Sequence, residues 1–177
     1  MRFRSPSLQE LDASGLIIVL HDVRDPGNVG TIIRTADAAG ATAVVLTGEC
    51  VDPYNPKTLR ATAGSIFHVP VVLESELSSA LAWFRANGGE TFATLVRGGS
   101  PMREADLSTD AMIVFGNESA GLYNNDSAKC SRTLSIEMVG QSESLNVAVA
   151  VGVVAFAAYD QRRRRANDDQ GPTMMAQ

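Results

Sequence analysis

Short apolar runs alternate along this chain with segments whose apolar residues recur at helical spacing, and this alternation most constrains the fold. The run at 15–20, GLIIVL, is rich in Ile and Val and is followed by the turn-forming sequence HDVRDPGN, as expected of a buried strand. The segment 28–39 then carries apolar residues three and four positions apart and ends at Gly40, as expected of a helix. Strands that alternate with helices favour an α/β fold, with a mostly parallel sheet and helices on both faces.

The same alternation continues to the end of the chain. Further strands are expected at 43–46, 91–96, 111–115 and 133–136, with a short extended piece at 69–73, and further helices at 56–64, 76–86 and 146–165. The last helix contains thirteen consecutive apolar residues or Gly, from Val147 to Tyr159, which is too short to span a bilayer. A helix that is apolar on all sides needs cover on all sides, and this favours a dimer over burial within its own chain.

Composition favours one domain of a protein without a membrane segment. The 177 residues are expected to form a leader or linker remnant at 1–14, one domain at 15–165 and a flexible tail at 166–177. The formal net charge of −5 disfavours a non-specific nucleic-acid binder, so any RNA contact must come from a local patch. Cys50 and Cys130 read as reduced thiols of a cytoplasmic protein, and His21 and His68 lack neighbours at metal-ligand spacing.

The first segment that could carry chemistry is 22–34, which joins a strand to a helix. Such turns lie at the carboxyl ends of parallel strands, where open α/β sheets bind ligands. Gly27 and Gly30 would allow a ligand to approach the backbone closely, although Asn28 could equally be a plain N-cap. Arg34 stands beside apolar residues, and the pattern leaves open whether it meets a ligand or pairs with Asp37.

Two further segments have the same character. In 113–122 a strand ends in Gly116-Asn117-Glu118, where the carboxylate is either an acid/base group or hydroxyl acceptor, or an ordinary solvated loop residue. In 136–150 a polar loop leads directly into the apolar last helix. Ser144 and Asn146 are suitable caps there, but half-buried polar groups beside that helix need partners, and a ligand could be one of them.

Taken together and in this order, the three segments resemble the motifs of the SpoU (TrmH-like) family of RNA 2′-O-ribose methyltransferases, in the SPOUT superfamily. The motif-like sequences are DPGNVGTIIRTADAAG, FGNESAGL and SIEMVGQSESLNVAVAVGV, and the resemblance runs from about Leu16 to Ala158. It implies a deep trefoil knot in the C-terminal part of the domain, bound S-adenosyl-L-methionine without a metal, and a homodimer that pairs through the first and last helices. The stretch from Val51 to Ser65 is more similar to the ribosomal RNA branch than to the minimal tRNA branch.

The resemblance also implies roles for individual residues. Arg34, Asn28, Glu118 and Asn146 match the catalytic positions, with Arg34 as a phosphate clamp and alkoxide stabiliser rather than a free base. The cofactor-binding positions are Leu95, Gly116, Asn117, Ile136, Ser144, Leu145 and Asn146. RNA contact is expected from Arg24, Arg34, Lys57 and Arg60, with Arg97 and Arg103 as further candidates.

Two other functions remain open at this point. One is a catalytically silent RNA-binding subunit on the same fold, which would have no need of all four catalytic-position residues. The other is a nucleotide-binding enzyme of a different kind, which the absence of GxGxxG and GxxxxGK[ST] patterns disfavours. The short stretch before the first strand is compatible with either a catalytic-domain fragment or a compact member of the family.

Overall fold

Seven parallel strands form a single sheet in the computed structural model, which describes residues 5–169. The strand order is β3-β2-β1-β6-β4-β7-β5, and all six neighbouring pairs run parallel. The strands are β1 (Leu16–His21), β2 (Ala43–Thr47), β3 (Val71–Glu74), β4 (Glu90–Thr94), β5 (Ser100–Pro101), β6 (Ala111–Phe115) and β7 (Arg132–Ser135). The expected parallel α/β sheet is therefore confirmed.

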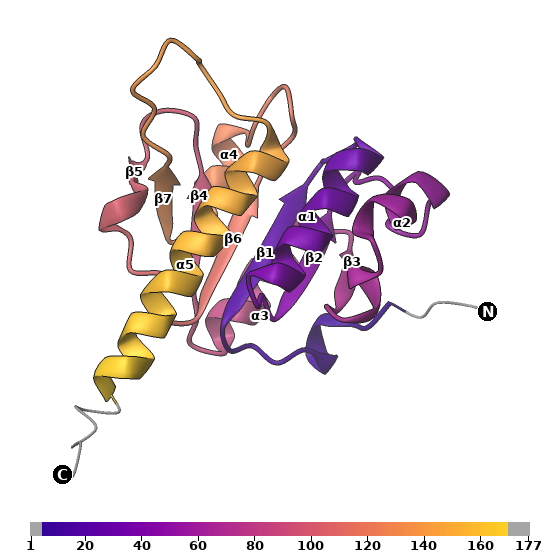
Figure 1. Ribbon diagram of the computed structural model, residues 1–177, viewed down its shortest axis with the longest axis horizontal. Coiled ribbons are helices and arrows are strands. Elements are labelled where there is room, and N and C mark those ends of the chain that lie inside the picture. The colour runs from indigo at the N-terminus through magenta and orange to yellow at the C-terminus, as the bar shows by residue number, and fades with distance from the viewer. Residues whose placement is uncertain (1–4, 170–177) are drawn as a thin grey trace, which may run out of the picture.

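Helices cover both faces of this sheet. In Figure 1, α1 (Pro26–Ala38) and α5 (Val147–Asp169) lie side by side on one face, with α2 (Pro56–Thr62) beside α1, while α3 (Leu77–Ala86) lies behind the sheet. The helix α4 (Asn124–Ser127) and the strand β5 were not expected, because elements of four and two residues carry too little periodicity to detect. Every longer helix and strand lies where the sequence predicts it, within a few residues.

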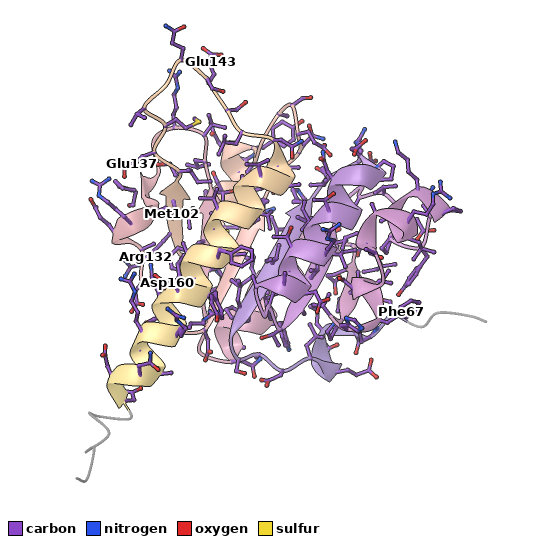
Figure 2. The ribbon with its side chains drawn as sticks, viewed as in Figure 1. Phe67, Met102, Arg132, Glu137, Glu143 and Asp160 are labelled. Carbon is purple, nitrogen blue, oxygen red and sulfur yellow. The ribbon has the colours of Figure 1, made fainter. Side chains whose placement is uncertain are left out.

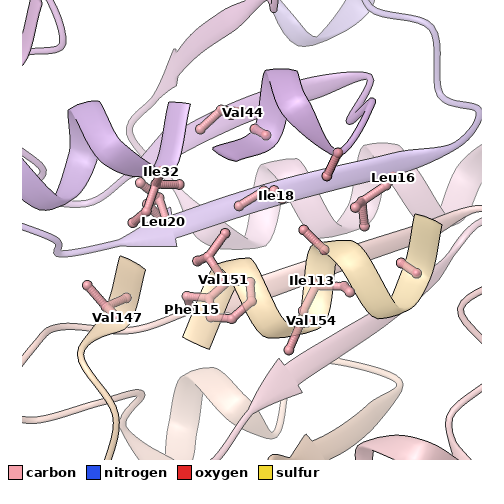
Figure 3. Close-up of a cluster of buried hydrophobic side chains, with 14 of the residues drawn as sticks. Leu16, Ile18, Leu20, Ile32, Val44, Ile113, Phe115, Val147, Val151 and Val154 are labelled. Carbon is pink, nitrogen blue, oxygen red and sulfur yellow. The ribbon is translucent and has the colours of Figure 1, made fainter. Parts of the chain in front are cut away.

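The strands are uniformly apolar because the sheet is buried on both faces. On the α1 and α5 face, Leu16, Ile18 and Leu20 pack with α1 and with Val151 and Val154 of α5 (Figure 3). Residues between them in β1, such as Ile17 and Val19, point to the opposite face and pack with the Leu81 and Phe84 side chains of α3. The packing of α5 against α1 and β1 buries one face of its apolar stretch, which includes Val151 and Val154, and leaves Val149, Val153 and Phe156 exposed.

The segment before β1 adds contacts that the sequence pattern did not reveal. Leu8, in a 3₁₀ turn (Leu8–Glu10), is buried in the core. The Ser5 hydroxyl donates to the carbonyl of Val71 at 2.7 Å and accepts from the amide of Leu73 at 3.1 Å, so this segment covers the free edge of β3. Of the expected tail at 166–177, residues 166–169 belong to α5 and residues 170–177 lie outside the described residues, as do residues 1–4.

The arginine run at 162–165 holds the end of α5 to the segment before β6. Arg162 donates to the carbonyl of Thr109 at 2.7 Å, and Arg165 to the hydroxyl of Ser108 at 3.3 Å. The preceding Gln161 bonds the same segment twice, accepting from the Leu107 amide at 2.7 Å and donating to the Ala105 carbonyl at 3.2 Å. These bonds give the helix partners beyond its apolar stretch, and it ends at Asp169 rather than at 165.

Candidate functional site

The turn between β1 and α1 is shaped by a cap that differs from the expected one. The Asp25 carboxylate accepts from the Asn28 amide at 2.8 Å, and Pro26 occupies the first helical position. Asp25 is therefore the N-cap, and the alternative that Asn28 is a plain N-cap is wrong. Because α1 begins two residues before Asn28, the Asn28 side chain is free to make other contacts.

Three polar side chains from three separate segments form one hydrogen-bonded chain. Asn28 donates through Nδ2 to Glu118 Oε1 at 3.2 Å and accepts through Oδ1 from Asn146 Nδ2 at 3.1 Å. Asn146 in turn accepts through Oδ1 from the Ala148 amide at 2.9 Å, which caps α5. The chain therefore links the N-termini of α1 and α5 to the loop after β6, and it fixes the orientation of both amide groups.

Glu118 is held as an ionised acceptor at the end of this chain. Its carboxylate also accepts from the Asp25 amide at 3.1 Å and more weakly from the Arg24 amide at 3.5 Å. Partial burial alone would raise the pKa of Glu118, but hydrogen bonds from its own main-chain amide, from the Asp25 and Arg24 amides and from the Asn28 side chain outweigh it and lower the pKa. A carboxylate held in this state can orient neighbouring groups but is a poor proton donor.

A pocket opens beside the network, at the carboxyl ends of β4, β6 and β7. Of the residues expected to bind a cofactor, the pocket is lined by Leu95, Gly116, Asn117, Ile136, Ser144 and Leu145. Asn146, also expected there, directs its side chain to Asn28 and to α5. The sequence reasoning did not single out the lining residues Thr94, Val96, Phe115, Ser119, Ala120, Gly121, Met138, Val147 and Ala150. Most of them directly flank a residue that it did, which is the signal that could have found them.

The loop that forms one wall of the pocket is closed on itself. Asn117 and Gly121 exchange main-chain hydrogen bonds at 3.1 and 2.8 Å, and the Asn117 side chain accepts from the amides of Ser119 and Ala120. A Cβ atom on Gly116 would lie 2.2 Å from the main-chain carbon of Gly121, so only glycine allows this closure. The pocket wall is thus preformed by its own backbone.

Gly30, which the sequence suggested for ligand approach, serves helix packing instead. A Cβ atom there would lie 2.5 Å from the Cβ of Ala61 and 2.6 Å from the carbonyl oxygen of Thr58, both on α2. The close approach is therefore between α1 and α2. This contact holds α2, with its basic side chains, next to the turn that carries Asn28.

Two arginines considered for RNA contact form ion pairs with glutamates of the loop between β7 and α5. Arg103 forms an ion pair with Glu137, and Arg97 forms a longer one with Glu143 at 3.9 Å. Figure 2 shows Glu137 and Glu143 on the loop between β7 and α5, with Glu143 near its tip. These pairs connect that loop to the segment between β4 and β6, while the side chains of both arginines remain exposed.

Arg34 lies outside the hydrogen-bonded network. It is exposed on α1, and within residues 5–169 it has no hydrogen bond or ion pair. The alternative that Arg34 pairs with Asp37 is wrong, because the Asp37 carboxylate instead contacts His68, with Oδ2 lying 3.1 Å from Nδ1. The structure therefore brings together three of the four expected catalytic residues and leaves the fourth available for a partner molecule.

The remaining expected RNA-binding residues lie around the same edge of the domain. Arg24 pairs with Glu49. Lys57 and Arg60 are exposed on α2 and form no ion pair in the described part of the chain. Among those residues there is also no group of three or more His, Cys, Asp or Glu side chains arranged to hold a metal ion, and no helix is long and apolar enough to cross a membrane.

Comparison with known proteins identifies relatives along nearly the whole domain. The model of the SpoU rRNA Methylase family matches residues 15–156. The chain is 40% identical over 148 residues to the 23S rRNA (guanosine(2553)-2′-O)-methyltransferase RlmP of Bacillus subtilis, an alignment that covers 84% of this chain and 59% of that protein. The chain spans between 50% and 59% of the length of this and two other curated relatives that it matches.

Solved structures agree with the sequence relatives. The structure of an AdoMet-bound rRNA methyltransferase from Sinorhizobium meliloti superimposes with a TM-score of 0.82 at 37% identity, covering 92% of this chain and 61% of that one. A protein whose structure is described in terms of 2-OH methylation on tRNA superimposes with a TM-score of 0.76 at 34% identity, covering 87% of this chain and 100% of that one.

Proposed function

The chain belongs to the SpoU rRNA methylase family, and from this we propose that it is an S-adenosylmethionine-dependent methyltransferase of a ribose 2′-hydroxyl in RNA, with ribosomal RNA as the favoured substrate. The observation that carries the proposal is the chain from Glu118 through Asn28 to Asn146 at the edge of a pocket. It joins the three segments that resemble the family motifs. The relatives named for 23S rRNA favour ribosomal RNA, while the tRNA-related structure keeps tRNA as the alternative.

The pocket residues fit a nucleoside cofactor. Leu95, Ile136 and Leu145 provide apolar walls of the kind that enclose a purine, and Thr94 and Ser144 add hydroxyl groups. S-adenosylmethionine, when bound, supplies a methyl group carried on a positively charged sulfur. The ionised Glu118 at the pocket wall contributes a negative charge that is complementary to such a group.

The polar network would orient the RNA nucleotide for the transfer. A ribose hydroxyl is a poor nucleophile, so it requires either a base or a positive group beside the developing alkoxide. Glu118 and the two asparagines are preorganised by their mutual hydrogen bonds and can hold the groups around the hydroxyl. Arg34 stays protonated and has no partner within residues 5–169, so we assign to it the contact with the phosphate and the developing negative charge.

Helix geometry favours a role for Arg34 in a second copy of the chain. Six residues separate it from Asn28, which places it about 9 Å further along α1 and about 240° around the axis. It therefore faces away from the network of its own chain. An exposed apolar stripe on the neighbouring α5, formed by Val149, Val153 and Phe156, supports a homodimer through α1 and α5. In such a dimer, Arg34 would reach the site of the partner.

We extend the proposal to the knot and to the location of the protein. After β7, near one edge of the sheet, the chain runs through the loop at 136–146 and returns to pack α5 on α1 and β1. This return across β4 and β6 supports the deep trefoil knot expected from the resemblance. The two free thiols, Cys50 and Cys130, favour the cytoplasm.

The test is transfer of a labelled methyl group from S-adenosylmethionine to pools of unmodified ribosomal RNA and tRNA. We expect label at a ribose 2′-oxygen in the ribosomal pool, and a loss of at least about 10²-fold in the rate for Arg34→Ala. Arg163→Ala is the matched control, because that exposed arginine forms an ion pair, within residues 5–169, only with Asp160 on its own helix. Absence of label from both pools while the cofactor still binds would contradict the proposal and favour a silent RNA-binding subunit.

A further inference from the structure

Asp22, the residue that directly follows β1, has a backbone conformation that most side chains avoid. Its φ of 60° lies in the left-handed region. Within residues 5–169, the one other non-glycine residue with a positive φ is Ala63, the C-cap of α2, where a left-handed residue is common. Asp22 follows a strand rather than a helix, so its conformation requires a different explanation.

Contacts on both sides of Asp22 hold this conformation. The Asp22 amide donates to the carbonyl of Thr47 at 3.1 Å, which continues the pairing of β1 with β2. Its carboxylate accepts through Oδ1 from the Glu49 amide at 2.7 Å. The next residue, Val23, is fully buried, and its carbonyl accepts from the Val51 amide at 3.1 Å. The chain is therefore fixed both before and after Asp22.

The main chain of Asp22 makes the contact with the pocket wall. Its carbonyl accepts from Asn117 Nδ2 at 2.9 Å. Asn117 lines the pocket, and its Oδ1 accepts from the amides of Ser119 and Ala120, which line the pocket as well. One side-chain amide thus joins the Asp22 carbonyl to the closed loop at 117–121.

The direction of this carbonyl depends on the backbone conformation of Asp22. Because the peptide unit is planar, a change of the Asp22 dihedral angles to the extended region would turn the carbonyl away from its present direction. The same turn presents the amides of Arg24 and Asp25 to Glu118, the next residue of the loop. The loop is therefore held at Asn117 and Glu118 by a turn whose path begins with the left-handed residue.

We propose that Asp22 is a positioning residue for the cofactor pocket: its left-handed backbone aims the carbonyl that holds Asn117, and so fixes the loop at 117–121 in the geometry that binds S-adenosylmethionine. The inference rests on the proposed function of that pocket. Aspartate suits this position, because it tolerates the left-handed region better than most residues and its carboxylate has a partner in the Glu49 amide. Substitutions of Asp22 should therefore change cofactor affinity according to how well each residue tolerates that conformation.

The experiment is calorimetric binding of S-adenosylhomocysteine to the full chain and to its Asp22→Gly and Asp22→Ala variants. Both substitutions remove the carboxylate, and with it the contacts to the Glu49 amide and to His21 Nε2, which lies 3.5 Å from Oδ2. Only alanine is disfavoured in the left-handed region. We expect Asp22→Gly to stay within about 2-fold of the wild-type dissociation constant. Asp22→Ala should raise it about 5-fold, as expected for the loss of one hydrogen bond of ordinary net strength.

Two further variants separate positioning from folding. Ala63→Val places a β-branched side chain at the other left-handed residue, which is exposed and does not line the pocket, so it should lower thermal stability and leave the affinity unchanged. Asn117→Asp keeps an acceptor for the loop amides but removes the donor to the Asp22 carbonyl. The double variant with Asp22→Ala should bind no more weakly than Asn117→Asp alone, because both changes break the same contact.

The outcomes are distinct. If Asp22→Ala binds S-adenosylhomocysteine as tightly as the wild type, or if Asp22→Gly loses as much affinity as Asp22→Ala, the inference is wrong while the proposed function stands. A similar loss in Ala63→Val would attribute the effect to general stability and would also overturn the inference, as would losses that multiply in the double variant. If the wild type binds no S-adenosylhomocysteine, the proposed function itself fails.

Discussion

Replacement of Gly30 by alanine tests how strongly the close approach of α1 and α2 constrains this position. Gly30 lies within α1, where alanine is favoured over glycine by about 1 kcal/mol on helix propensity alone. The added methyl group would meet the main chain of α2 at 2.6 Å, well inside ordinary van der Waals contact, and a main-chain atom cannot turn aside. Overpacking of this kind costs about 1–3 kcal/mol.

Gly152 provides a matched control on the neighbouring helix. It lies within α5, and a Cβ atom there would meet only the methyl group of Thr35, at an ordinary 3.8 Å. The propensity gain is the same for both substitutions, so it cancels in the comparison. Gly152→Ala should stabilise the protein by up to about 1 kcal/mol. Gly30→Ala should be less stable than Gly152→Ala by the steric cost, about 1–3 kcal/mol.

The free energy of unfolding is measured by urea titration followed by far-UV circular dichroism. All variants are compared at one protein concentration, because dimer formation would make stability depend on concentration. The two melting temperatures should differ by about 2–4 °C for each kcal/mol. Equal stability of Gly30→Ala and Gly152→Ala would refute the argument, since it would mean that α2 does not constrain α1 at this position.

Three further predictions follow from side chains outside the network. Gln161→Met should lower the free energy of unfolding by about 1–3 kcal/mol in the same urea assay, because the Leu107 amide and the Ala105 carbonyl lose their hydrogen-bond partner. Unchanged stability would contradict this prediction. Arg103→Gln removes the exposed ion pair with Glu137 and should weaken S-adenosylhomocysteine binding by up to about 5-fold in low salt. The loss should be smaller in high salt, because salt screens exposed charges. A loss of affinity that does not depend on salt would argue against a role for this ion pair. Burial raises the pKa of the Cys50 and Cys130 thiols to about 11. Both thiols should therefore stay neutral at pH 8 and react slowly with a thiol reagent until the protein is unfolded. Rapid labelling of the native protein would contradict this prediction.

Local patterns determined most of the fold. The uniformly apolar strands and the helices with three- and four-residue spacing were predictable because each pattern reports the burial of a short, continuous segment. The same holds for much of the pocket, since its lining residues at 94–96, 115–121 and 136–138 lie at or just after the ends of predicted strands. Short elements such as β5 and α4 were missed because they hold too few residues to show a period.

The roles of individual side chains depended on which distant segments meet. Asn28 and Asn146 are 118 positions apart, and no local pattern could show that their amides bond each other and leave the cap of α1 to Asp25. Likewise, the sequence suggested that Gly30 allows a ligand to approach, whereas the fold shows that it allows α2 to pack closely against α1.

Charge pairing was decided in the same way. Arg97 and Arg103 carry the same charge in the sequence as Arg34, but only the fold shows that the first two form ion pairs with the loop after β7, whereas Arg34 forms none within residues 5–169. The sequence by itself determined which segments are buried and which residues stand at the carboxyl ends of the strands, because burial is encoded locally by apolar spacing. Only the tertiary structure decided which polar groups become partners, because a hydrogen bond or ion pair depends on a few ångströms between residues that the chain places far apart.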